Sequence, residues 1–478
     1  MTASDVPSVA MFVFNDAILD SRVRREAATL VAAGYRVTVV GMASEADLQA
    51  AETESLDGVQ IIRLPVRSRW LPAWRLVAQP WALRRRSVGA LRRGVTGGPS
   101  QWATIPSAVA GLGSAFALST ARGIALAIAS ARRRDRDLAW PPAGLNRLVY
   151  WRLMVLGWAR DAGRAAPIAD VYHGHDLPGL AAAVAAADRS GGLVLYDSHE
   201  IFLESGAYAD LPGLVKHLIA RQERGLARRA AALVTVNPAI GAELQRRLPV
   251  KRLVVVHNCP PRWTPPERPR RLLRTAAKIP PDASILLYHG VFTNHRGLEQ
   301  LAEASLEPGL ERSHVVYLGY GASRPEVDAL VADPRFGGRL HVLDAVDPSV
   351  LLDWVAGADV GVIPGQPSTL NHWLSSPNKL FEALAAGVPV AIMDFPYVHQ
   401  LVLDDPAGPL GTVCDPADPA SIARAVREIL ERPEKARLAL RARCLAAAHD
   451  RWNWETESAR LVTLYAELLE RASTTIKG

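Results

Sequence analysis

The sequence predicts an α/β protein built from two parallel-sheet domains, and three observations lead to this prediction. First, 478 residues exceed what one hydrophobic core normally supports. Second, short, almost continuously apolar runs alternate with helical segments in both halves of the chain, a pattern typical of parallel sheets covered by helices on both faces. Third, five prolines between Pro260 and Pro269 separate the two halves, as an interdomain linker would.

The composition is that of a folded protein, with 49% hydrophobic and 22% charged residues. Cys259, Cys414 and Cys444 lie far apart without C-x-x-C spacing, which suits neither a metal site nor a disulfide framework. The first residues lack the basic, apolar and small-residue pattern of a secretory signal. We therefore expect a cytoplasmic protein.

In the first half, the apolar runs predict strands that are separated by helical segments. The helical run 22–33 ends at Gly34. The expected strands are residues 9–14, 36–40, 60–64, 170–172, 193–196, 232–236 and 253–256. In such sheets ligands bind at the carboxyl ends of the strands, so the residues that follow each strand are the candidates for a site.

Polar residues gather after three of these strands. Asp16 follows the first strand, and Asp20 opens the segment DSRVRREA. The segment HGHDLPG begins at His173, and DSHE begins at Asp197. Histidines and carboxylates that converge at one sheet edge are suited to orienting a substrate. The candidates on this side are Asp16, His175, Asp176, His199 and Glu200.

Plainer interpretations of these residues stay open. Asp20 is also an ordinary helix cap, and His173 and His199 are also suited to bonding backbone carbonyls. His173 and His175 could share a divalent ion with nearby acids, but the spacing fixes no third ligand. We expect no metal.

A basic segment rich in tryptophan interrupts the first half. Between Arg67 and Arg136 there are thirteen arginines and one acidic residue, and seven of the twelve tryptophans lie between Trp70 and Trp158. Such composition favours an anionic membrane surface. The uncharged run 103–121 is nearly long enough to span a membrane, but its small residues and Pro106 favour a buried helical segment. A nucleic-acid partner is not expected, and a solvated loop whose tryptophans pack on their own domain is the alternative.

The second half has the same alternation, with strands expected at residues 284–288, 314–318, 340–343, 359–363 and 388–393. Two loops that follow strands carry glycines. Gly290 precedes Arg296, which offers a cation to a diphosphate, and Gly319 and Gly321 permit close approach of a ligand.

The third segment of interest is SPNKLFEALAAGVPVAIMD, residues 376–394. Ser376 is placed to cap a helix that has Pro377 at its first position and ends at Gly387. Asn378, Lys379 and Glu382 share its polar side at the positive end of the helix dipole, which suits a phosphate and paired hydroxyls. A solvated Lys379–Glu382 pair is the plainer alternative.

This segment, together with the segment DSRV, the H-x-H turn and the two glycine loops, resembles the family 4-like glycosyltransferases of the GT-B fold, in the branch that reads PNK-L-F-E and then A-G-x-P-V. The resemblance implies two Rossmann-like domains facing a cleft. The expected domains are an acceptor-side domain at 1–265 with an insertion at about 67–165, a nucleotide-sugar domain at 266–450, and a terminal helix at 451–478 that crosses back to the first domain. Trp452 and Trp454 are expected to anchor this tail by packing.

The same resemblance implies a retaining glycosyltransferase that uses a nucleotide-diphosphate sugar and no further cofactor. Arg296 and Lys379 would stabilise the leaving diphosphate, Glu382 would bind the ribose, and His175 would face the transferred sugar. The acceptor would be a glycan or a lipid-linked molecule in polysaccharide or glycoconjugate biosynthesis. The protein would work in the cytoplasm, at the cytoplasmic face of the membrane if the basic segment binds there.

Two positions depart from the family pattern. Leu374 stands where many members have a glutamate eight residues before Glu382, and Val291 stands where a basic residue is common. Asn371 and His372 are the neighbours that could contact the sugar instead. Two alternatives follow: a GT-B nucleotide-sugar epimerase, which would need acid and base carboxylates that Leu374 does not supply, and a non-catalytic membrane-associated partner of a glycan assembly complex.

Overall fold

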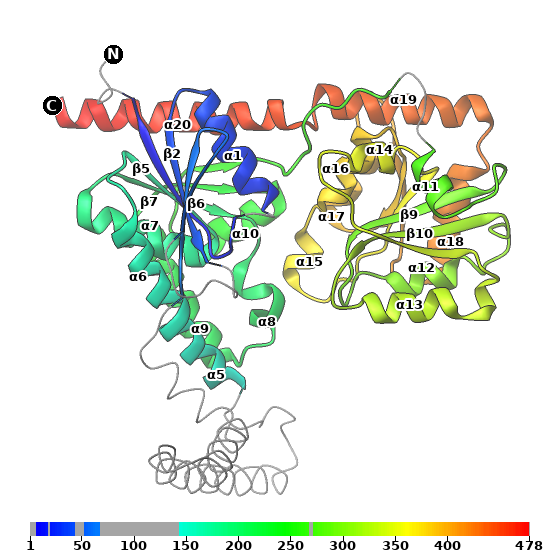
Figure 1. The fold of residues 1–478 in the computed structure, drawn as a ribbon, viewed down its shortest axis with the longest axis horizontal. Coiled ribbons are helices and arrows are strands. Elements are labelled where there is room, and N and C mark those ends of the chain that lie inside the picture. The colour runs from blue at the N-terminus through cyan, green and yellow to red at the C-terminus, as the bar shows by residue number, and fades with distance from the viewer. Residues whose placement is uncertain (1–5, 18–19, 44–51, 67–142, 267–270, 478) are drawn as a thin grey trace, which may run out of the picture. The chain divides into compact units, whose positions relative to one another are not determined.

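The fold was examined in a computed structural model that describes residues 6–17, 20–43, 52–66, 143–266 and 271–477. The chain forms two compact units, residues 1–197 with 206–231 and residues 198–205 with 232–478. The domain limits expected at 265/266 and 450/451 stay predictions. Figure 1 shows two sheets with helices around each.

The first sheet has eight strands in the described part of the chain, in the order β3-β4-β2-β1-β5-β6-β7-β8. Strand β3 pairs antiparallel with β4, whereas β1 pairs parallel with β2 and β5, β2 with β4, β5 with β6, and β7 with β8. The strands are β1 (Ser8–Phe12), β2 (Arg36–Met42), β3 (Glu52–Leu56), β4 (Val59–Leu64), β5 (Val171–His175), β6 (Leu193–Ser198), β7 (Ala230–Thr235) and β8 (Leu253–Val255). The helices of this part are α1 (Ser21–Ala32), α5 (Ala143–Tyr150), the π-helix η3 (Trp151–Val155), α6 (Leu156–Ala165), α7 (Asp176–Ser190), the short 3₁₀ helix η4 (Phe202–Glu204), α8 (Gly206–Ala209), α9 (Gly213–Ala227) and α10 (Pro238–Arg247).

The second sheet has six described strands in the order β11-β10-β9-β12-β13-β14, and every pair is parallel. The strands are β9 (Ser284–Val291), β10 (Ser313–Tyr320), β11 (Leu340–Asp344), β12 (Val360–Ile363), β13 (Val390–Met393) and β14 (Gly411–Cys414). The helices are α11 (Leu272–Ala276), α12 (Leu298–Ala304), α13 (Arg324–Ala332), η5 (Pro334–Phe336), α14 (Leu351–Val355), α15 (Leu370–Leu374), α16 (Asn378–Ala385), α17 (Pro396–Leu403), α18 (Pro419–Leu430), α19 (Glu434–Asp450) and α20 (Trp454–Lys477).

Both sheets confirm the predicted α/β class, and the apolar runs predict most of the strands. The sequence missed β3, whose five residues are all exposed, because a strand without a buried face has no apolar period. It also missed β14, a run of four residues.

The expected start of the helix at residue 376 is wrong by one position. The N-cap is Pro377, which lacks a capping side chain, and α16 begins at Asn378. The Ser376 hydroxyl instead accepts a hydrogen bond from the Asn237 side chain at 3.2 Å. The expected end is confirmed, because Gly387 adopts φ +68° directly after the helix and donates its N–H to Leu384.

The C-terminal helix α20 contacts β8 of the first sheet, and the Arg460 guanidinium lies 3.4 Å from the Val255 carbonyl. Trp454 is buried, and the Trp452 ring packs edge-on against His257 at 5.1 Å between centroids. The expected packing role of both tryptophans is confirmed.

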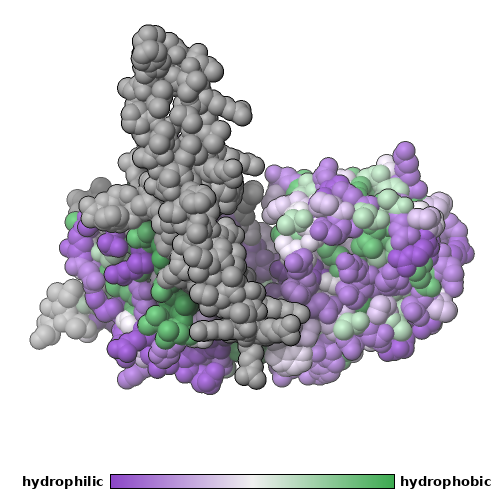
Figure 2. Space-filling model, turned by 90° about the horizontal axis from the view of Figure 1, so that it is seen from below, coloured by the Kyte–Doolittle hydropathy of each residue, from purple (hydrophilic) through white to green (hydrophobic). Residues whose placement is uncertain are grey.

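The basic segment falls mostly on residues 67–142, which lie outside the described residues. Its described end, residues 143–165, places Trp151 and Trp158 in the interior, with exposed fractions of 1% and 0%. Two of the seven tryptophans therefore pack on their own unit. Among the described helices, none is long and apolar enough to cross a membrane, and Figure 2 shows hydrophilic residues over much of the visible described surface.

Candidate functional site

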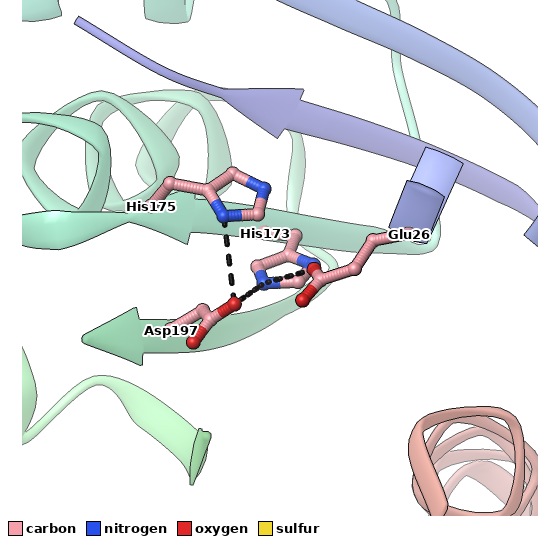
Figure 3. A group of neighbouring side chains, drawn as sticks. All are labelled: Glu26, His173, His175 and Asp197. Carbon is pink, nitrogen blue, oxygen red and sulfur yellow. Dashed lines mark ion pairs between the residues drawn. The ribbon is translucent and has the colours of Figure 1, made fainter. Parts of the chain in front are cut away.

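Two groups of candidate residues are described in turn, one in each unit. The first is a buried cluster of Arg22, Glu26, His173, His175 and Asp197, called the Arg22 cluster below; Figure 3 shows the last four side chains turned toward one another. The register of the sheet explains the arrangement, because His175 on β5 lies opposite Asp197 on β6. Side chains two apart on a strand share a face, so His173 and His175 stack with ring centroids 4.3 Å apart.

Arg22 joins the two carboxylates of this cluster. Its Nε lies 2.9 Å from Glu26 Oε1 and 3.1 Å from Asp197 Oδ2, and its Nη2 donates to Asp197 Oδ1 at 3.2 Å. Burial alone would lower the pKa of Arg22, but the charges of Asp197 and Glu26 raise the pKa above its usual value. Arg22 is therefore a permanent buried cation that holds Asp197 in place.

Asp197 in turn faces both histidines. Its Oδ2 lies 3.5 Å from His175 Nδ1 and 3.7 Å from His173 Nε2, and His173 Nε2 is 3.8 Å from Glu26 Oε2. Contacts of this length orient the rings by charge. Of this cluster the sequence selected His175 as a site residue and noted His173 and Asp197 only as members of their segments. It missed Arg22 and Glu26, because the segment DSRVRREA also fits a solvated helix face.

Two glycines of the segment HGHDLPG let helix α7 pack closely on the sheet. A Cβ at Gly174 would lie 2.4 Å from Leu180 N, and a Cβ at Gly179 would lie 2.3 Å from Phe12 O. Asp176 opens the helix with φ +53°, a conformation that aspartate tolerates better than most residues. This tight turn fixes where His175 points.

The donor atoms of Glu26, His173, His175 and Asp197 all lie within 4.8 Å of one another, so this set could hold a metal ion. The sequence reasoning missed this set because Glu26 is distant in the chain and belongs to a helix. In the structure, Arg22 binds oxygens of both carboxylates and supplies positive charge at the place where an ion would sit. The chemistry of the donor set permits an ion, whereas the charge balance already includes a cation. The expectation of no metal stays a prediction.

The remaining acceptor-side candidates are spread over several loops. The Asp16 carbonyl accepts from Arg63 Nε at 2.9 Å. His199 and Glu200 are half-buried after β6. The Ser198 hydroxyl donates to the Glu200 carbonyl at 2.8 Å, which tightens this turn. Their roles stay predictions.

The second group lies at the carboxyl edge of the second sheet. The ammonium group of Lys379 lies 3.8 Å from the centroid of the Tyr288 ring, a cation–π contact. Gly290 follows on β9 with φ +110°, and a Cβ there would lie 3.6 Å from Lys379 Nζ. Lys379, Arg296 and Tyr288 border a small pocket of about 20 Å³. The structure thus brings together Gly290, Arg296 and Lys379, which the sequence had placed on separate segments.

Lys379 carries the largest electrostatic perturbation at this edge. Desolvation, together with the nearby charge of Arg296, lowers the pKa of Lys379 to about 7, although Glu382 opposes this shift. An anion placed between the two cations would relieve their repulsion. The site is therefore electrostatically prepared for a phosphate.

Glu382 is held by a histidine that sequence reasoning did not select. His289 Nε2 lies 2.9 Å from Glu382 Oε2, and the His289 side chain is 4% exposed against 24% for Glu382. At this distance the tautomer with the proton on His289 Nε2 can donate a hydrogen bond to Glu382. That bond fixes the orientation of the Glu382 carboxylate. The available signal was the position of His289, a polar residue at the end of a strand beside Gly290.

Gly319 and Gly321 are required by the protein's own backbone. A Cβ at Gly319 would lie 1.9 Å from the carbonyl oxygen of Gly290, its partner in the sheet register. Gly321 has φ +144°, and a Cβ there would lie 2.2 Å from Phe292 O. These glycines are needed for packing between β9 and β10, a reason different from the ligand approach expected from the sequence.

The helix start and the segment around Leu374 complete this edge. Asn378 is exposed at the first residue of α16. Asn371 is 6% exposed and its side-chain oxygen accepts from Ile201 N at 2.9 Å, so it has a structural partner. His372 borders the pocket and bonds Ser368 through Nδ1 at 2.7 Å, while burial and then Arg296 lower its pKa. Of the two candidates near Leu374, His372 is the one beside the cations.

Comparisons with known proteins cover both halves of the chain. The family model described as "Glycosyl transferase 4-like domain" matches residues 19–259, and the one described as "Glycosyl transferases group 1" matches residues 283–432. A D-inositol 3-phosphate glycosyltransferase of Thermobispora bispora is 28% identical over 224 residues, which are 44% of this chain and 49% of that protein. A glycogen synthase of Mycobacterium tuberculosis is 25% identical over 308 residues, 62% of this chain and 68% of that protein. The chain spans about half the length of the first of these relatives.

Solved structures show the same fold over nearly the whole chain. Sucrose-phosphate synthase from Thermosynechococcus elongatus aligns with a TM-score of 0.65 and 17% identity, over 97% of this chain and 100% of that one. HepE of Anabaena in complex with UDP-glucose aligns with a TM-score of 0.60 and 11% identity, over 96% of this chain and 99% of that one. With two matched family models and two parallel-sheet α/β domains, the chain belongs to the family 4-like glycosyltransferases of the GT-B fold.

Proposed function

We propose that this protein transfers a sugar, with retention of anomeric configuration, from a nucleotide-diphosphate donor to a glycan or lipid-linked acceptor. The observation that carries the proposal is that Arg296 and Lys379 border the same pocket. Glu382 lies on the same helix as Lys379, and His289 at the end of β9 fixes its carboxylate. Two cations suit a diphosphate, and a fixed carboxylate suits the paired hydroxyls of a ribose.

The chemistry proposed for this site is charge stabilisation. Breaking the anomeric bond leaves negative charge on the departing diphosphate. Arg296, Lys379 and the N-terminus of α16 would hold that charge without a metal ion. Glu382 would accept hydrogen bonds from the ribose 2′ and 3′ hydroxyls. His372, beside the cations, is the candidate for the sugar contact that Leu374 does not provide.

On the acceptor side, His175 would face the transferred sugar. The other residues of the Arg22 cluster would fix the orientation of the His175 imidazole ring. Asp16, Asp176, His199 and Glu200 are proposed as acceptor contacts on the basis of the sequence. The basic segment 67–136 supports a place at the cytoplasmic face of the membrane, in polysaccharide or glycoconjugate biosynthesis. Flotation with anionic vesicles tests this, and equal binding after deletion of residues 67–136 would count against it.

Donor identity is tested first by thermal shift with UDP, GDP, TDP and ADP, and then with the matching nucleotide sugars. UDP is a sensible start because HepE of the same fold was solved with UDP and with UDP-glucose. Glu382→Ala should raise the donor's dissociation constant while the protein stays folded. Unchanged donor binding in this variant would contradict the proposal that Glu382 binds the ribose. Glu299→Ala, an exposed carboxylate on α12, is the control.

Turnover assays separate the proposed function from the alternatives. A transferase needs an acceptor and gives a product whose anomeric configuration can be read by NMR. Conversion of the nucleotide sugar without acceptor would support an epimerase instead. If the nucleotide sugar is neither converted nor slowly hydrolysed, the result would favour the alternative of a non-catalytic partner in a glycan assembly complex.

A further inference from the structure

The second unit has a cavity away from the donor site that is lined by arginines. Its volume is about 350 Å³, within the range of roughly 300 to 1,000 Å³ that is common for small-molecule sites. It lies among α11, α18 and α19, beside Asp359 and Pro389, which immediately precede β12 and β13. Gly290 and Lys379 stand at the carboxyl edge of the same parallel sheet, so the cavity lies at the opposite edge. We call it the arginine pocket.

The charge of this pocket is strongly unbalanced. Its ionisable lining consists of Arg271, Arg274, Arg437, Arg441, Asp359 and Glu434, which leaves a net charge of +2. Within the described ranges, none of these arginines has a carboxylate oxygen within 4 Å. By contrast, Arg22 on α1 and Arg63 on β4 are ion-paired.

Three of the four guanidinium groups donate to backbone carbonyls, and for Arg437 the acceptor is Leu430 O at 3.4 Å. Arg441 donates through Nη1 to Ala358 O at 2.8 Å and through Nη2 to Ala356 O at 3.1 Å. Arg274 donates to the carbonyls of Pro280 and Ala283. A guanidinium has five N–H donors, so each retains donors for a ligand while its position is fixed in advance.

One carboxylate of the pocket is already engaged elsewhere. Asp359 Oδ2 accepts a hydrogen bond from Ile285 N at 2.8 Å, which ties it to the sheet. Burial lowers the pKa of Arg441, while the charge of Asp359 partly opposes this shift. Asp359 therefore compensates the half-buried charge of Arg441 only in part, and an anion in the pocket would add to that attraction. The apolar wall, which includes Leu438 and Ile429, suits an organic group beside that anion.

We propose that the arginine pocket binds a small phosphorylated molecule at a site separate from the donor site. Planar guanidinium groups match phosphate oxygens in bidentate fashion, which favours phosphate over a simple halide. Helix α16, which carries Lys379 and Glu382, packs on α19, which carries Arg437 and Arg441. A ligand that shifts α19 on binding to the pocket would therefore also shift α16, the helix that carries Lys379 and Glu382.

The test is isothermal titration of the full chain, in phosphate-free buffer, with inorganic phosphate and with phenyl phosphate. Phenyl phosphate should bind more tightly than phosphate because of the apolar wall. Arg437→Gln, whose side chain is exposed, and Arg441→Gln should each weaken binding about tenfold. Arg424→Gln on α18, outside the pocket and 61% exposed, is the matched control and should bind like the native chain.

Two comparisons keep the sites apart. Lys379→Met removes a donor-site cation and should leave phenyl phosphate binding unchanged, whereas loss of binding in that variant would assign the anion to the donor site. Equal affinity in the native chain, Arg437→Gln and Arg441→Gln would overturn the proposal. Binding to phosphatidic acid vesicles without binding of either soluble phosphate would also overturn it, in favour of a lipid headgroup.

Discussion

The lowered pKa of Lys379 predicts that donor binding depends on pH. With a pKa of about 7 in the free protein, Lys379 is mostly charged at pH 6 and mostly neutral at pH 8. Only the charged form pairs with a diphosphate, and the bound diphosphate raises the pKa of Lys379 by direct attraction. The contribution of Lys379 to donor affinity is therefore greatest well below pH 7, and it decreases as the pH rises through 7.

The magnitude follows from the same pKa. We take the pKa of Lys379 in the donor complex to lie well above 8. The dissociation constant is then proportional to one plus the ratio of neutral to charged Lys379 in the free protein. It therefore rises about tenfold from pH 6 to pH 8. At pH 7 about half of the molecules must take up one proton on binding. Of the neighbouring groups, an arginine such as Arg296 is charged at both pH values, and the lowered pKa of His372 moves its titration below its usual range. Two further histidines lie nearby, His295 at the pocket and His289 on Glu382, and the Lys379→Arg variant separates their contribution from that of the lysine.

The assay is isothermal titration with a nucleotide sugar, since its diphosphate diester has no ionisation near pH 7, in two buffers of different ionisation enthalpy. The difference between the two heats gives the number of protons taken up. Lys379→Arg should bind with nearly the same affinity at pH 6 and pH 8, because arginine remains charged. Lys379→Gln should bind weakly at both values.

Two results would refute this reasoning. One is a native dissociation constant that is equal at pH 6 and pH 8. The other is an equal pH dependence in the native chain and in Lys379→Arg, which would place the titrating group elsewhere.

The remaining predictions concern positioning and packing. His289→Ala should raise the donor dissociation constant about threefold to tenfold through loss of one charge-assisted hydrogen bond to Glu382, with recovery in His289→Gln; a change in kcat with no change in donor binding would contradict this. Arg22→Met should lower the free energy of unfolding by about 3 to 5 kcal/mol in urea titrations, because two buried carboxylates lose their cation, whereas a loss below 1 kcal/mol would show that the charges are relieved by water. Gly319→Ala should cost about 3 kcal/mol or more, since the new methyl would overlap Gly290 O, and Gly213→Ala, with open space around it, is the control. Elemental analysis of the purified chain should find less than about 0.1 equivalent of zinc, and EDTA should leave turnover unchanged; a stoichiometric ion would make the Arg22 cluster a metal centre.

The sequence by itself determined the class of the fold and the segments that carry the site. Parallel strands buried on both faces are typically nearly continuous apolar runs, which is why β9 and β13 could be located from composition alone. The end of α16 was equally readable, because the backbone at Gly387 needs a positive φ that glycine adopts without strain. Arg296 and Lys379 could be selected because one follows a glycine turn and the other lies at a helix start, and the family resemblance favoured a ligand site over a solvated Lys379–Glu382 pair.

The tertiary structure alone decided which polar residues meet. Pairing across the sheets put His175 opposite Asp197 and Gly319 opposite Gly290, and a register is a long-range property that no local pattern encodes. The same holds for Arg22, which looked like one of several exposed arginines on an amphipathic helix and is instead 3% exposed between two carboxylates. Whether such a charge is a solvated surface group or a buried anchor depends on what packs against its helix, and that is fixed only when the chain has folded.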